Sequence, residues 1–566
     1  MADRQEWQFV VTDALEKVFP DEAPAERGGG GASSVFLGET ASFQLAFLPP
    51  VARKLQNLDI LRIEVDPASA HLVTMSTVDL VPAMLVAFEG HDDGYLRDKP
   101  GLYPDLLTPC PDGIVHPSIG LWRSVWFDVR ADDLADSGMH RIGITVRSAR
   151  DDRILFTTGI DVTVIPRTLP ELDIVNTHWL HADCLAQYYD VEVFSEEHWR
   201  IIEQFVMSAA EMNATSLLTP TWTPPLDTKV GGRRLPVQLI DIAEEHGAYR
   251  FEFGKLRRWL DICARHGIRT VEIAHLFTQW GAEATPAIYV DTPMGVEQRF
   301  GWHVPAVAPE YRDLLEQLIP ALRAFLEESW DGAVVYHVSD EPRGFMIDSY
   351  AAARAVVDDL LEGCLIIDAL SDLEFAASGV VDVPVVATNA VRPFLEAGVD
   401  PLWVYYCVSQ HTDVANRYIG LPSSRSRVLG HQLFAFRVKG FLHWGFNFYN
   451  AQYSTHPIDP FRDTCANGAF PAGDPFIVYP GPDGAPLLSI RYRVFAQAMA
   501  DHRAMQLLRD LRGFDAVIAV IDPGGTLAFD SFSYDPLHYL RARERINSEI
   551  VAALDEAKVD GEMSNR

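Results

Sequence analysis

Hydrophobic and polar residues alternate in short runs over the first third of the chain, and turn residues separate these runs. The alternation is clear at residues 41–47 (ASFQLAF), 59–65 (DILRIEV), 124–129 (SVWFDV), 140–146 (HRIGITV) and 160–165 (IDVTVI). A period of two residues is typical of antiparallel strands with one buried face. We therefore expect a β-sandwich over residues 1–170, with a flexible joint at the four glycines 28–31.

From residue 171 onward, short apolar and β-branched runs alternate with segments of helical periodicity. The runs predict eight strands, at residues 173–178, 215–218, 269–275, 333–338, 365–369, 384–388, 402–407 and 441–446. Helices are clearest at residues 198–211, 253–266 and 310–328. This order predicts a closed (β/α)₈ TIM barrel over residues 171–508. An open doubly wound sheet is the rival, but no predicted strand is followed by the Gly-x-Gly-x-x-Gly turn of a nucleotide site.

The last part of the chain, residues 509–566, follows a closing helix predicted at residues 489–508. The run at residues 514–529 (FDAVIAVIDPGGTLAF) is typical of a hairpin whose turn is Pro523-Gly524-Gly525. An amphipathic helix is expected over residues 536–557. The predicted fold class is therefore α/β, a TIM barrel with an N-terminal β-sandwich domain and a small C-terminal β element.

Composition and charge exclude several kinds of partner. The chain has 566 residues with 47 Lys and Arg against 79 Asp and Glu, and its net charge of −32 repels phosphate backbones and anionic lipids. No apolar run reaches the roughly 18 residues of a membrane helix, and the first residues lack the features of a signal peptide. We therefore expect a cytoplasmic protein that binds neither nucleic acid nor membranes. Six scattered cysteines indicate reduced thiols rather than a zinc or disulfide framework.

Polar and aromatic side chains follow the predicted barrel strands, which is where barrel enzymes place their reactive groups. The fourth strand ends in Asp340-Glu341. Two adjacent carboxyls push their pKa values apart, so that one is protonated near neutral pH while the other stays an anion. That division suits the cleavage of a glycosidic bond, and Asp340 and Glu341 are the candidate catalytic residues. The structural alternative is an exposed acidic turn or a helix N-terminal cap before Pro342.

The seventh predicted strand, residues 402–407 (LWVYYC), contains no acid that could serve as a nucleophile. The substrate can supply one instead, because the carbonyl oxygen of a 2-acetamido group can attack the anomeric carbon. In that scheme Asp340 holds the acetamido N–H, while Glu341 protonates the leaving oxygen and then activates water. The alternative is a glycosidase for another sugar that uses a distant carboxylate, such as Asp368 or Asp413.

Residues at the other strand ends are candidates for binding the sugar. Aromatic faces suit the C–H side of a pyranose, and polar side chains suit its hydroxyls. Tyr405 and Tyr406 point in opposite directions along their strand, so one faces the pocket, and Tyr406 is preferred. The candidate binding residues are His181, Asp183, His275, Trp280, Tyr406, Trp444 and Asn447. A metal site built from His178, His181, Asp183 and His275 is disfavoured because their spacing is not a tight ligand motif, and no metal or cofactor is expected.

At these residues the chain resembles glycoside hydrolase family 123 and the related proteins with the domain of unknown function 4091. The resemblance covers about residues 172–508 and rests on the segments 181–184 (HADC), 219–228 (TPTWTPPLDT), 272–281 (EIAHLFTQWG), 337–342 (HVSDEP), 440–447 (GFLHWGFN), 473–481 (GDPFIVYPG) and 489–491 (SIR). It implies a β-sandwich before a catalytic barrel, and a retaining β-N-acetylgalactosaminidase that works by substrate assistance. The family's adjacent Asp and Glu correspond to Asp340 and Glu341, and its pocket residues are similar to Tyr406, Trp444 and Asn447. The chain departs from the family at Phe446, Phe448 and Phe495-Ala496, which leaves the exact substrate open.

The sequence therefore predicts an exo-acting glycosidase for a carbohydrate with a terminal β-linked 2-acetamido sugar. It does not separate GalNAc from GlcNAc, and it leaves open the aglycone, the linkage, the role of the sandwich and the oligomeric state, a homo-oligomer included. An alternative of a different class is a non-catalytic carbohydrate-binding protein.

Overall fold

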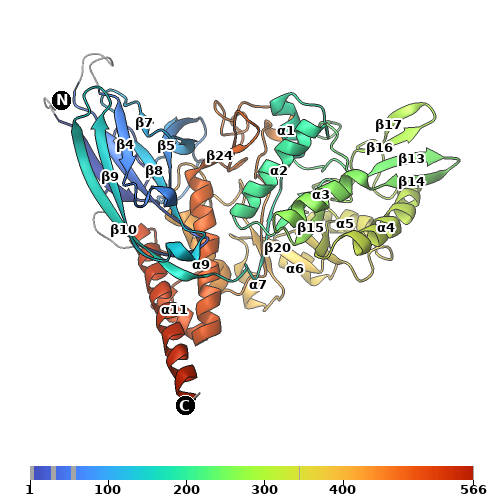
Figure 1. The fold of residues 1–566 in the computed structure, drawn as a ribbon. Helices are drawn as coiled ribbons and strands as arrows, with labels where there is room; N and C mark the ends of the chain where they lie inside the picture. The colour runs from blue at the N-terminus through green and yellow to red at the C-terminus, as the bar shows by residue number, and fades with distance from the viewer. Residues whose placement is uncertain (1–5, 27–32, 52–58, 343, 565–566) are drawn as a thin grey trace.

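The N-terminal strands form two sheets packed face to face (Figure 1). The computed structural model describes residues 6–26, 33–51, 59–342 and 344–564, so the four glycines 28–31 lie outside the described residues. Apolar residues of both sheets, such as Leu45, Phe127 and Val146, enclose a common core. The predicted β-sandwich is therefore confirmed. Its strands are β1 (Gln8–Asp13), β2 (Ser33–Leu37), β3 (Thr40–Leu48), β4 (Leu61–Val65), β5 (Val73–Ala83), β6 (Gly101–Pro109), β7 (Ile114–Val115), β8 (Arg123–Arg130), β9 (Gly138–Ser148) and β10 (Ile154–Thr168).

Two strands from far along the chain complete one sheet of the sandwich. The five-stranded sheet has the order β2-β10-β9-β4-β7, and the seven-stranded sheet has the order β1-β3-β8-β5-β6-β24-β23. The strands β23 (Tyr479–Pro480) and β24 (Pro486–Ser489) follow the last barrel strand, and β24 pairs with β6. The segment after the last barrel strand thus supplies one edge of the sandwich sheet, which the sequence pattern did not predict.

Eight parallel strands form a closed barrel, and each overlaps a predicted strand. The barrel closes where β22 pairs with β11, with Val175 opposite Gly440. The predicted TIM barrel is confirmed, and the open doubly wound sheet is wrong. The strands are β11 (Val175–His178), β12 (Ser216–Thr219), β15 (Thr270–Ile273), β18 (Ala333–Tyr336), β19 (Leu365–Ala369), β20 (Val383–Ala387), β21 (Trp403–Tyr405) and β22 (Gly440–His443).

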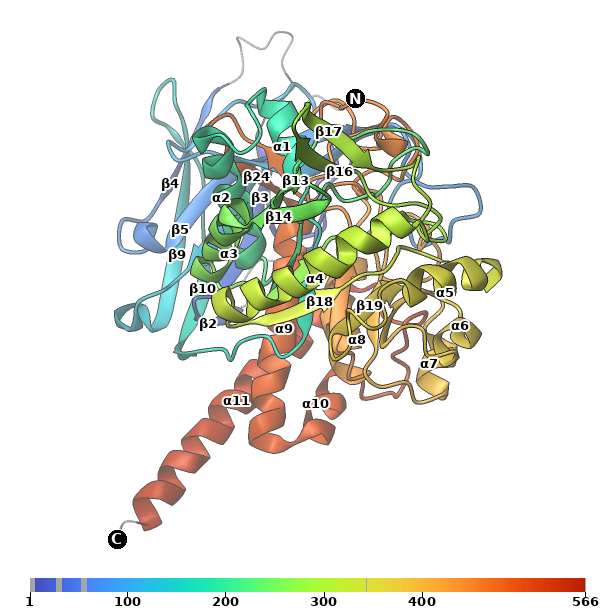
Figure 2. The ribbon, with the colours of Figure 1, turned by 90° about the vertical axis from the view of Figure 1, so that its right-hand side faces the viewer.

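Helices cover the outside of the barrel, and Figure 2 shows α2, α3 and α4 on one side of it. The apolar stripe of α4 is buried, with Leu314, Leu318 and Leu322 inaccessible to solvent. The closing helix α9 contacts both α8 and β6, so it joins the barrel to the sandwich. The helices are α1 (Ala182–Tyr189), α2 (Glu196–Glu211), α3 (Gly254–Arg265), α4 (Pro309–Ser329), α5 (Ile347–Ala355), α6 (Leu373–Ala377), α7 (Arg392–Glu396), α8 (Ser424–Ala435) and α9 (Ile490–Arg512).

A small four-stranded sheet is inserted into the barrel, beyond the ends of β12 and β15. Its order is β14-β13-β16-β17. The first pair follows β12 and the second follows β15, so two βα connections are lengthened at the carboxyl side of the barrel. The sequence pattern did not predict this sheet. The strands are β13 (Asp241–Glu245), β14 (Ala248–Glu252), β16 (Ile288–Thr292) and β17 (Gly295–Phe300).

The C-terminal region is helical, so the predicted β hairpin at residues 514–529 is wrong. The first half of this predicted hairpin forms the helix α10 (Phe514–Ile521), and the helix α11 (Pro536–Ser564) follows later in the chain. Val517, Val520 and Ile521 recur at helical spacing and are buried against α9 and α11. This packing outweighs the preference of the β-branched residues for strands.

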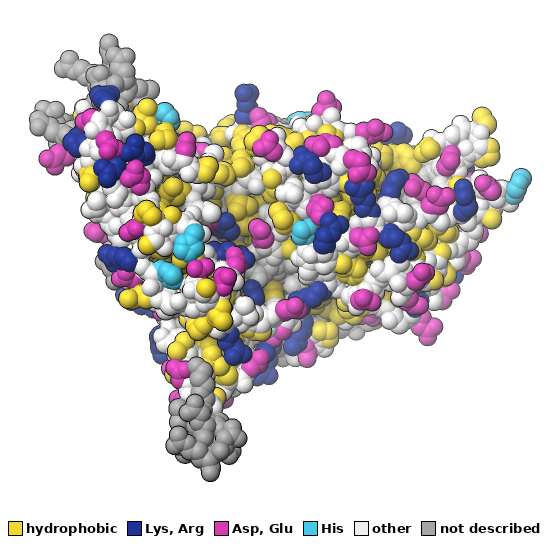
Figure 3. Space-filling model, viewed as in Figure 1, with side chains coloured by type: hydrophobic (Ala, Val, Ile, Leu, Met, Phe, Trp, Pro, Cys, Tyr) yellow, Lys and Arg dark blue, Asp and Glu magenta, His cyan; other side chains and the backbone are white. Residues whose placement is uncertain are grey.

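The surface carries acidic and basic side chains interspersed with apolar ones, as the face in Figure 3 shows. In the part of the chain that the structure describes, no helix has the length and apolar character needed to cross a membrane. All six cysteines are free thiols, five of them buried and Cys364 half-buried, as expected.

Candidate active site

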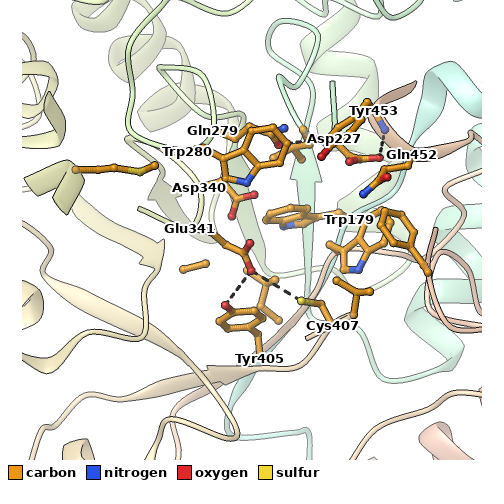
Figure 4. A pocket seen from close by; sticks show the side chains of 17 residues that line it. Trp179, Asp227, Gln279, Trp280, Asp340, Glu341, Tyr405, Cys407, Gln452 and Tyr453 are labelled. Atoms are coloured by element: carbon orange, nitrogen blue, oxygen red, sulfur yellow. Dashed lines mark hydrogen bonds between the residues drawn. The ribbon is translucent and has the colours of Figure 1, made fainter. Parts of the chain in front are cut away.

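A cavity of about 440 Å³ lies at the carboxyl ends of the barrel strands (Figure 4). Segments that follow β11, β12, β15, β18, β21 and β22 form its wall. Its size is in the range of pockets for small ligands. The residues that line it are Trp179, Leu226, Asp227, Gln279, Trp280, Asp340, Glu341, Met346, Ala369, Tyr405, Cys407, Val408, Leu442, Trp444, Gln452, Tyr453 and Phe470.

The acid pair, Asp340 and Glu341, follows β18 and lines this cavity. The hydroxyl of Tyr405 donates a hydrogen bond of 2.9 Å to Oε1 of Glu341, and Sγ of Cys407 lies 3.8 Å from the same oxygen. Glu341 has a φ of 46°, in the left-handed region, so the backbone is strained at this residue. The backbone N–H of Trp280 donates to the carbonyl of Asp340 at 2.9 Å. The acid pair is therefore held from two sides, and the alternative of an exposed acidic turn is excluded.

The two carboxyls of the acid pair interact strongly. Burial, followed by the negative charge of Glu341, raises the pKa of Asp340 well above its usual value, whereas the nearby His337 lowers it. A coupled pair of this kind titrates as a unit. We therefore expect the acid pair to hold one proton near neutral pH, as a general acid beside an anion requires.

Below the acid pair, His337 lies between two buried carboxylates. Its Nε2 is 2.6 Å from Oε1 of Glu272, and its Nδ1 is 3.1 Å from Oδ1 of Asp368. Burial lowers the pKa of His337, but the two negative charges outweigh it and raise the pKa to about 10. Glu272 also accepts the indole N–H of Trp179 at 2.7 Å, and Asp368 accepts backbone N–H groups of the segment before the acid pair. This cluster of Glu272, His337 and Asp368 thus connects one pocket wall to the acid pair.

His275 stacks on His337 and does not line the cavity, although it was expected to bind the sugar. The ring centroids are 4.2 Å apart. Both ring nitrogens of His275 are buried without a hydrogen-bond partner among the described residues, and burial lowers its pKa well below the usual value. The ligand atoms of His275, His337 and Asp368 lie within 4.8 Å of one another. However, Glu272 and Asp368 already engage both nitrogens of His337, which argues against a metal ion there.

Three other predicted binding residues form a buried cluster behind the cavity wall. Arg234 donates to both oxygens of Asp183, at 2.7 and 2.8 Å, and its Nη2 lies 3.0 Å from Nδ1 of His181. Asn447 accepts from the backbone N–H of His181 at 2.8 Å and donates to its carbonyl at 3.1 Å. None of these four residues lines the cavity, because their polar atoms hold together the segments after β11, β12 and β22. Because Arg234 engages both Asp183 and Nδ1 of His181, these contacts argue against a metal ion at the two residues.

Along β21, Tyr405 faces the cavity and Tyr406 does not. Trp403, Tyr405 and Cys407 belong to the apolar cluster inside the barrel. Tyr406 does not belong to this cluster; it is fully buried, and its ring centroid lies 5.3 Å from that of His443. The preference for Tyr406 is therefore wrong.

Trp280 and Trp444 line the cavity, as expected from the sequence. The indole N–H of Trp444 donates to Oδ2 of Asp474 at 3.1 Å, and burial raises the pKa of Asp474 to about 7. The ring of Trp280 meets that of Tyr453 edge to face, with centroids 5.8 Å apart. Aromatic faces of this kind suit the C–H side of a pyranose ring.

Sequence reasoning missed several residues of the cavity wall. Trp179 directly follows β11, and the alternation along that strand is the signal that could have placed it. Asp227, Gln452 and Tyr453 lie in long irregular segments, where no periodicity indicates the direction of a side chain. Gln279 directly precedes the predicted binding residue Trp280 and follows the third predicted strand.

The chain is similar to known glycoside hydrolases. Residues 179–508 match the family model of the glycoside hydrolase 123 catalytic domain. A family 123 glycoside hydrolase from Clostridium perfringens, studied for glycolipid glycan hydrolysis, is 13% identical with a TM-score of 0.72, over 98% of this chain and 99% of that one. A family 39 glycoside hydrolase from Bacteroides cellulosilyticus WH2 is 9% identical with a TM-score of 0.34, over 80% of this chain and 79% of that one. Among curated proteins, no sequence matches the chain.

Proposed function

Because the chain belongs to glycoside hydrolase family 123, and its substrate is therefore a carbohydrate, we propose that it is a retaining exo-β-N-acetylgalactosaminidase. The proposed reaction uses the 2-acetamido group of the substrate as the nucleophile. The observation that carries this proposal is that Asp340 and Glu341, adjacent in sequence, both line the cavity at the barrel mouth. The similar Clostridium perfringens enzyme is described for glycolipid glycans, so terminal sugars of such glycans are a suitable first class of natural substrate to test.

Glu341 is the general acid and base in this proposal. Its Oε1 receives hydrogen bonds from Tyr405 and Cys407, which fix the direction of the carboxyl group. In the first step Glu341 donates its proton to the leaving oxygen while the amide carbonyl oxygen attacks the anomeric carbon. In the second step the Glu341 carboxylate removes a proton from water, and the water oxygen opens the cyclic intermediate.

Asp340 binds the acetamido N–H as an anion in this proposal, although burial and the charge of Glu341 favour its protonated form before the substrate binds. An amide N–H stabilises the charged form of a carboxyl, so substrate binding favours the proton on Glu341 and the charge on Asp340. His337 beneath the pair acts in the same direction, because it lowers the pKa of Asp340. This division gives each member of the acid pair one role in the first step.

The two distant acids considered from the sequence do not support a two-carboxylate mechanism. Asp368 is fully buried and bonded to His337 and Tyr350, and Asp413 is exposed outside the cavity. Neither lines the cavity. Substrate assistance therefore remains the better account of how a nucleophile reaches the anomeric carbon.

Chromogenic β-GalNAc, β-GlcNAc and β-Gal glycosides test the proposal when they are assayed side by side. We expect cleavage of the GalNAc glycoside with retention and no comparable cleavage of the plain galactoside. Glu341→Gln should lose at least about 10²-fold in kcat, and Asp340→Asn should lose a similar factor on acetamido sugars. Asp348→Asn, on the exposed start of α5, is the matched control. Equal rates on GalNAc and plain galactose would refute substrate assistance, and binding without turnover would indicate a carbohydrate-binding protein.

A further inference from the structure

We propose that Asp227 and Gln279 determine which 2-acetamido sugar the pocket accepts, by binding a hydroxyl on the C3–C4 edge of the terminal ring. This inference rests on the proposed function, because it takes the acid pair to mark the C1 and C2 positions. Nothing in the sequence pattern singled out Asp227, and the acid-pair chemistry does not use it.

Asp227 is a carboxylate of the cavity wall that two neighbouring loops hold in place. Its backbone N–H donates to Oε1 of Gln279 at 2.7 Å, and its Oδ2 accepts the backbone N–H of Tyr453 at 2.8 Å. The hydroxyl of Ser454 donates to its carbonyl at 2.8 Å. Its φ of 36° lies in the left-handed region, so the surrounding contacts maintain a strained backbone. Strain of this kind is common where a side chain is positioned for a ligand.

One oxygen of this carboxylate is left for a ligand. Within the described ranges, Oδ1 of Asp227 has no hydrogen-bond partner, whereas Oδ2 is engaged. Burial raises the pKa of Asp227 to about 6, so the group is an anion and a pure acceptor at the pH of a neutral assay. Asp183, which is fully buried, differs because Arg234 engages both of its oxygens.

Gln279 supplies the complementary donor. Its Oε1 accepts from Asp227, which fixes the orientation of the amide, and its Nε2 is buried without an acceptor among the described side chains and backbone. A sugar hydroxyl both accepts and donates, so one hydroxyl can accept from Nε2 of Gln279 and donate to Oδ1 of Asp227. The two residues thus form a donor and acceptor pair that an adjacent hydroxyl would complete.

The position of this pair relative to the acid pair assigns it to the C3–C4 edge. Tyr405 holds Glu341 at one end of the cavity, and Trp280, the neighbour of Gln279, donates its backbone N–H to Asp340. Figure 4 shows the resulting order from Tyr405 through Glu341 and Asp340 to Gln279 and Asp227. If Glu341 serves C1 and Asp340 serves C2, the next groups along the same ring are those on C3 and C4. GalNAc and GlcNAc differ only at C4, so this is where selectivity between them would arise.

Deoxy sugars test the inference on the unmodified enzyme. Chromogenic β-GalNAc is compared at pH 7.5 with β-GlcNAc and with the 3-deoxy and 4-deoxy forms of GalNAc. We expect one deoxy form to lose at least about 10²-fold in kcat/KM, because a site built to bond a hydroxyl rejects an analogue that lacks it. In Asp227→Asn and Gln279→Met, kcat/KM for the parent GalNAc glycoside should fall by a similar factor. The ratio of kcat/KM between the parent and the deoxy sugar, which we call the deoxy penalty, should then shrink to less than about threefold. Asp190→Asn, at the exposed end of α1, is the control.

The outcomes separate this inference from the function on which it rests. Efficient cleavage of GalNAc by the wild type, with both deoxy forms cleaved equally well, would overturn the inference and leave the proposed function standing. A full deoxy penalty that persists in both variants would also overturn it. Loss of all turnover in Asp227→Ala, restored by azide with formation of a glycosyl azide, would make Asp227 a nucleophile and overturn both. No turnover of any 2-acetamido glycoside by the wild type would overturn the proposed function, and the inference with it.

Discussion

His337→Gln removes the positive charge from the buried cluster beneath the acid pair. The imidazole is in contact with Glu272 at 2.6 Å and Asp368 at 3.1 Å, and its side chain is only 1% exposed. Glutamine retains hydrogen-bonding groups of similar reach but cannot carry a proton charge. The variant therefore leaves two carboxylates buried without their cation.

The expected loss of stability follows from the pKa of His337. Its rise from the usual 6.5 to about 10 corresponds to about 5 kcal/mol in favour of the protonated folded state. Removal of one partner from a buried ion pair costs about 3–5 kcal/mol, which agrees with this figure. A histidine with a raised pKa stabilises the fold fully below pH 6.5, and this contribution is lost as the pH rises towards 10.

Thermal unfolding of the wild type and His337→Gln between pH 6 and pH 10 measures this contribution. We expect the variant to unfold about 5 °C lower at pH 6, and the difference to shrink steadily above pH 6.5. His456→Gln, at an exposed histidine, is the control and should show no such trend. A difference in Tm that is the same at pH 6 and pH 10 would refute the assignment of a charged His337.

The same substitution also changes the pH dependence of activity. His337 lowers the pKa of Asp340, so its removal raises that pKa and a higher pH is needed to ionise Asp340. We therefore expect the acidic limb of the kcat/KM profile to move to higher pH in His337→Gln. A purely structural role for His337 would reduce the rate without moving this limb.

Three further predictions concern other contacts of the site. Tyr405→Phe removes a hydrogen bond to Glu341 and should lower kcat about 10- to 100-fold, while Tyr406→Phe, outside the cavity, should leave kcat unchanged; equal effects in steady-state assays would contradict the orientation of β21. Arg234→Met leaves a buried carboxylate unpaired and should destabilise the protein by about 3–5 kcal/mol, and an unchanged Tm would contradict the buried ion pair. Burial raises the pKa of the Cys407 thiol well above its usual value, so activity should survive iodoacetamide at pH 8, and rapid inactivation through this residue would show a thiolate there.

The barrel could be predicted from the sequence because each of its strands is a short apolar run between helical segments. The segment 514–521 could not, since FDAVIAVI has the composition of a strand and becomes α10 through burial against α9 and α11. The edge pairing of β24 with β6 was equally out of reach, because it joins Leu488 to Leu107 across most of the chain. Local sequence patterns predict helices and strands. Where one segment could form either, packing against distant parts of the chain decides which of them forms.

The acid pair could be predicted for a similar reason, since it lies just beyond the end of a barrel strand. The binding residues were harder. His181 and Asp183 also follow a strand, but Arg234 from a distant loop takes their polar atoms away from the cavity. Side chains alternate in direction along β21 as predicted, but Tyr405 and Tyr406 are adjacent and so point to opposite sides. The sequence alone could not show which of the two tyrosines faces the cavity.

The number of acids around the cavity does not equal the number of acids that react. Glu272 and Asp474 each accept an indole N–H, from Trp179 at 2.7 Å and Trp444 at 3.1 Å. A buried indole N–H needs an acceptor, and a carboxylate fixes the ring more firmly than a neutral group does. These two acids therefore position the aromatic walls, and neither of them lines the cavity. The acid pair differs because its two carboxyl groups line the cavity. A carboxyl group near the barrel mouth therefore indicates a chemical role only where its oxygens are open to the cavity.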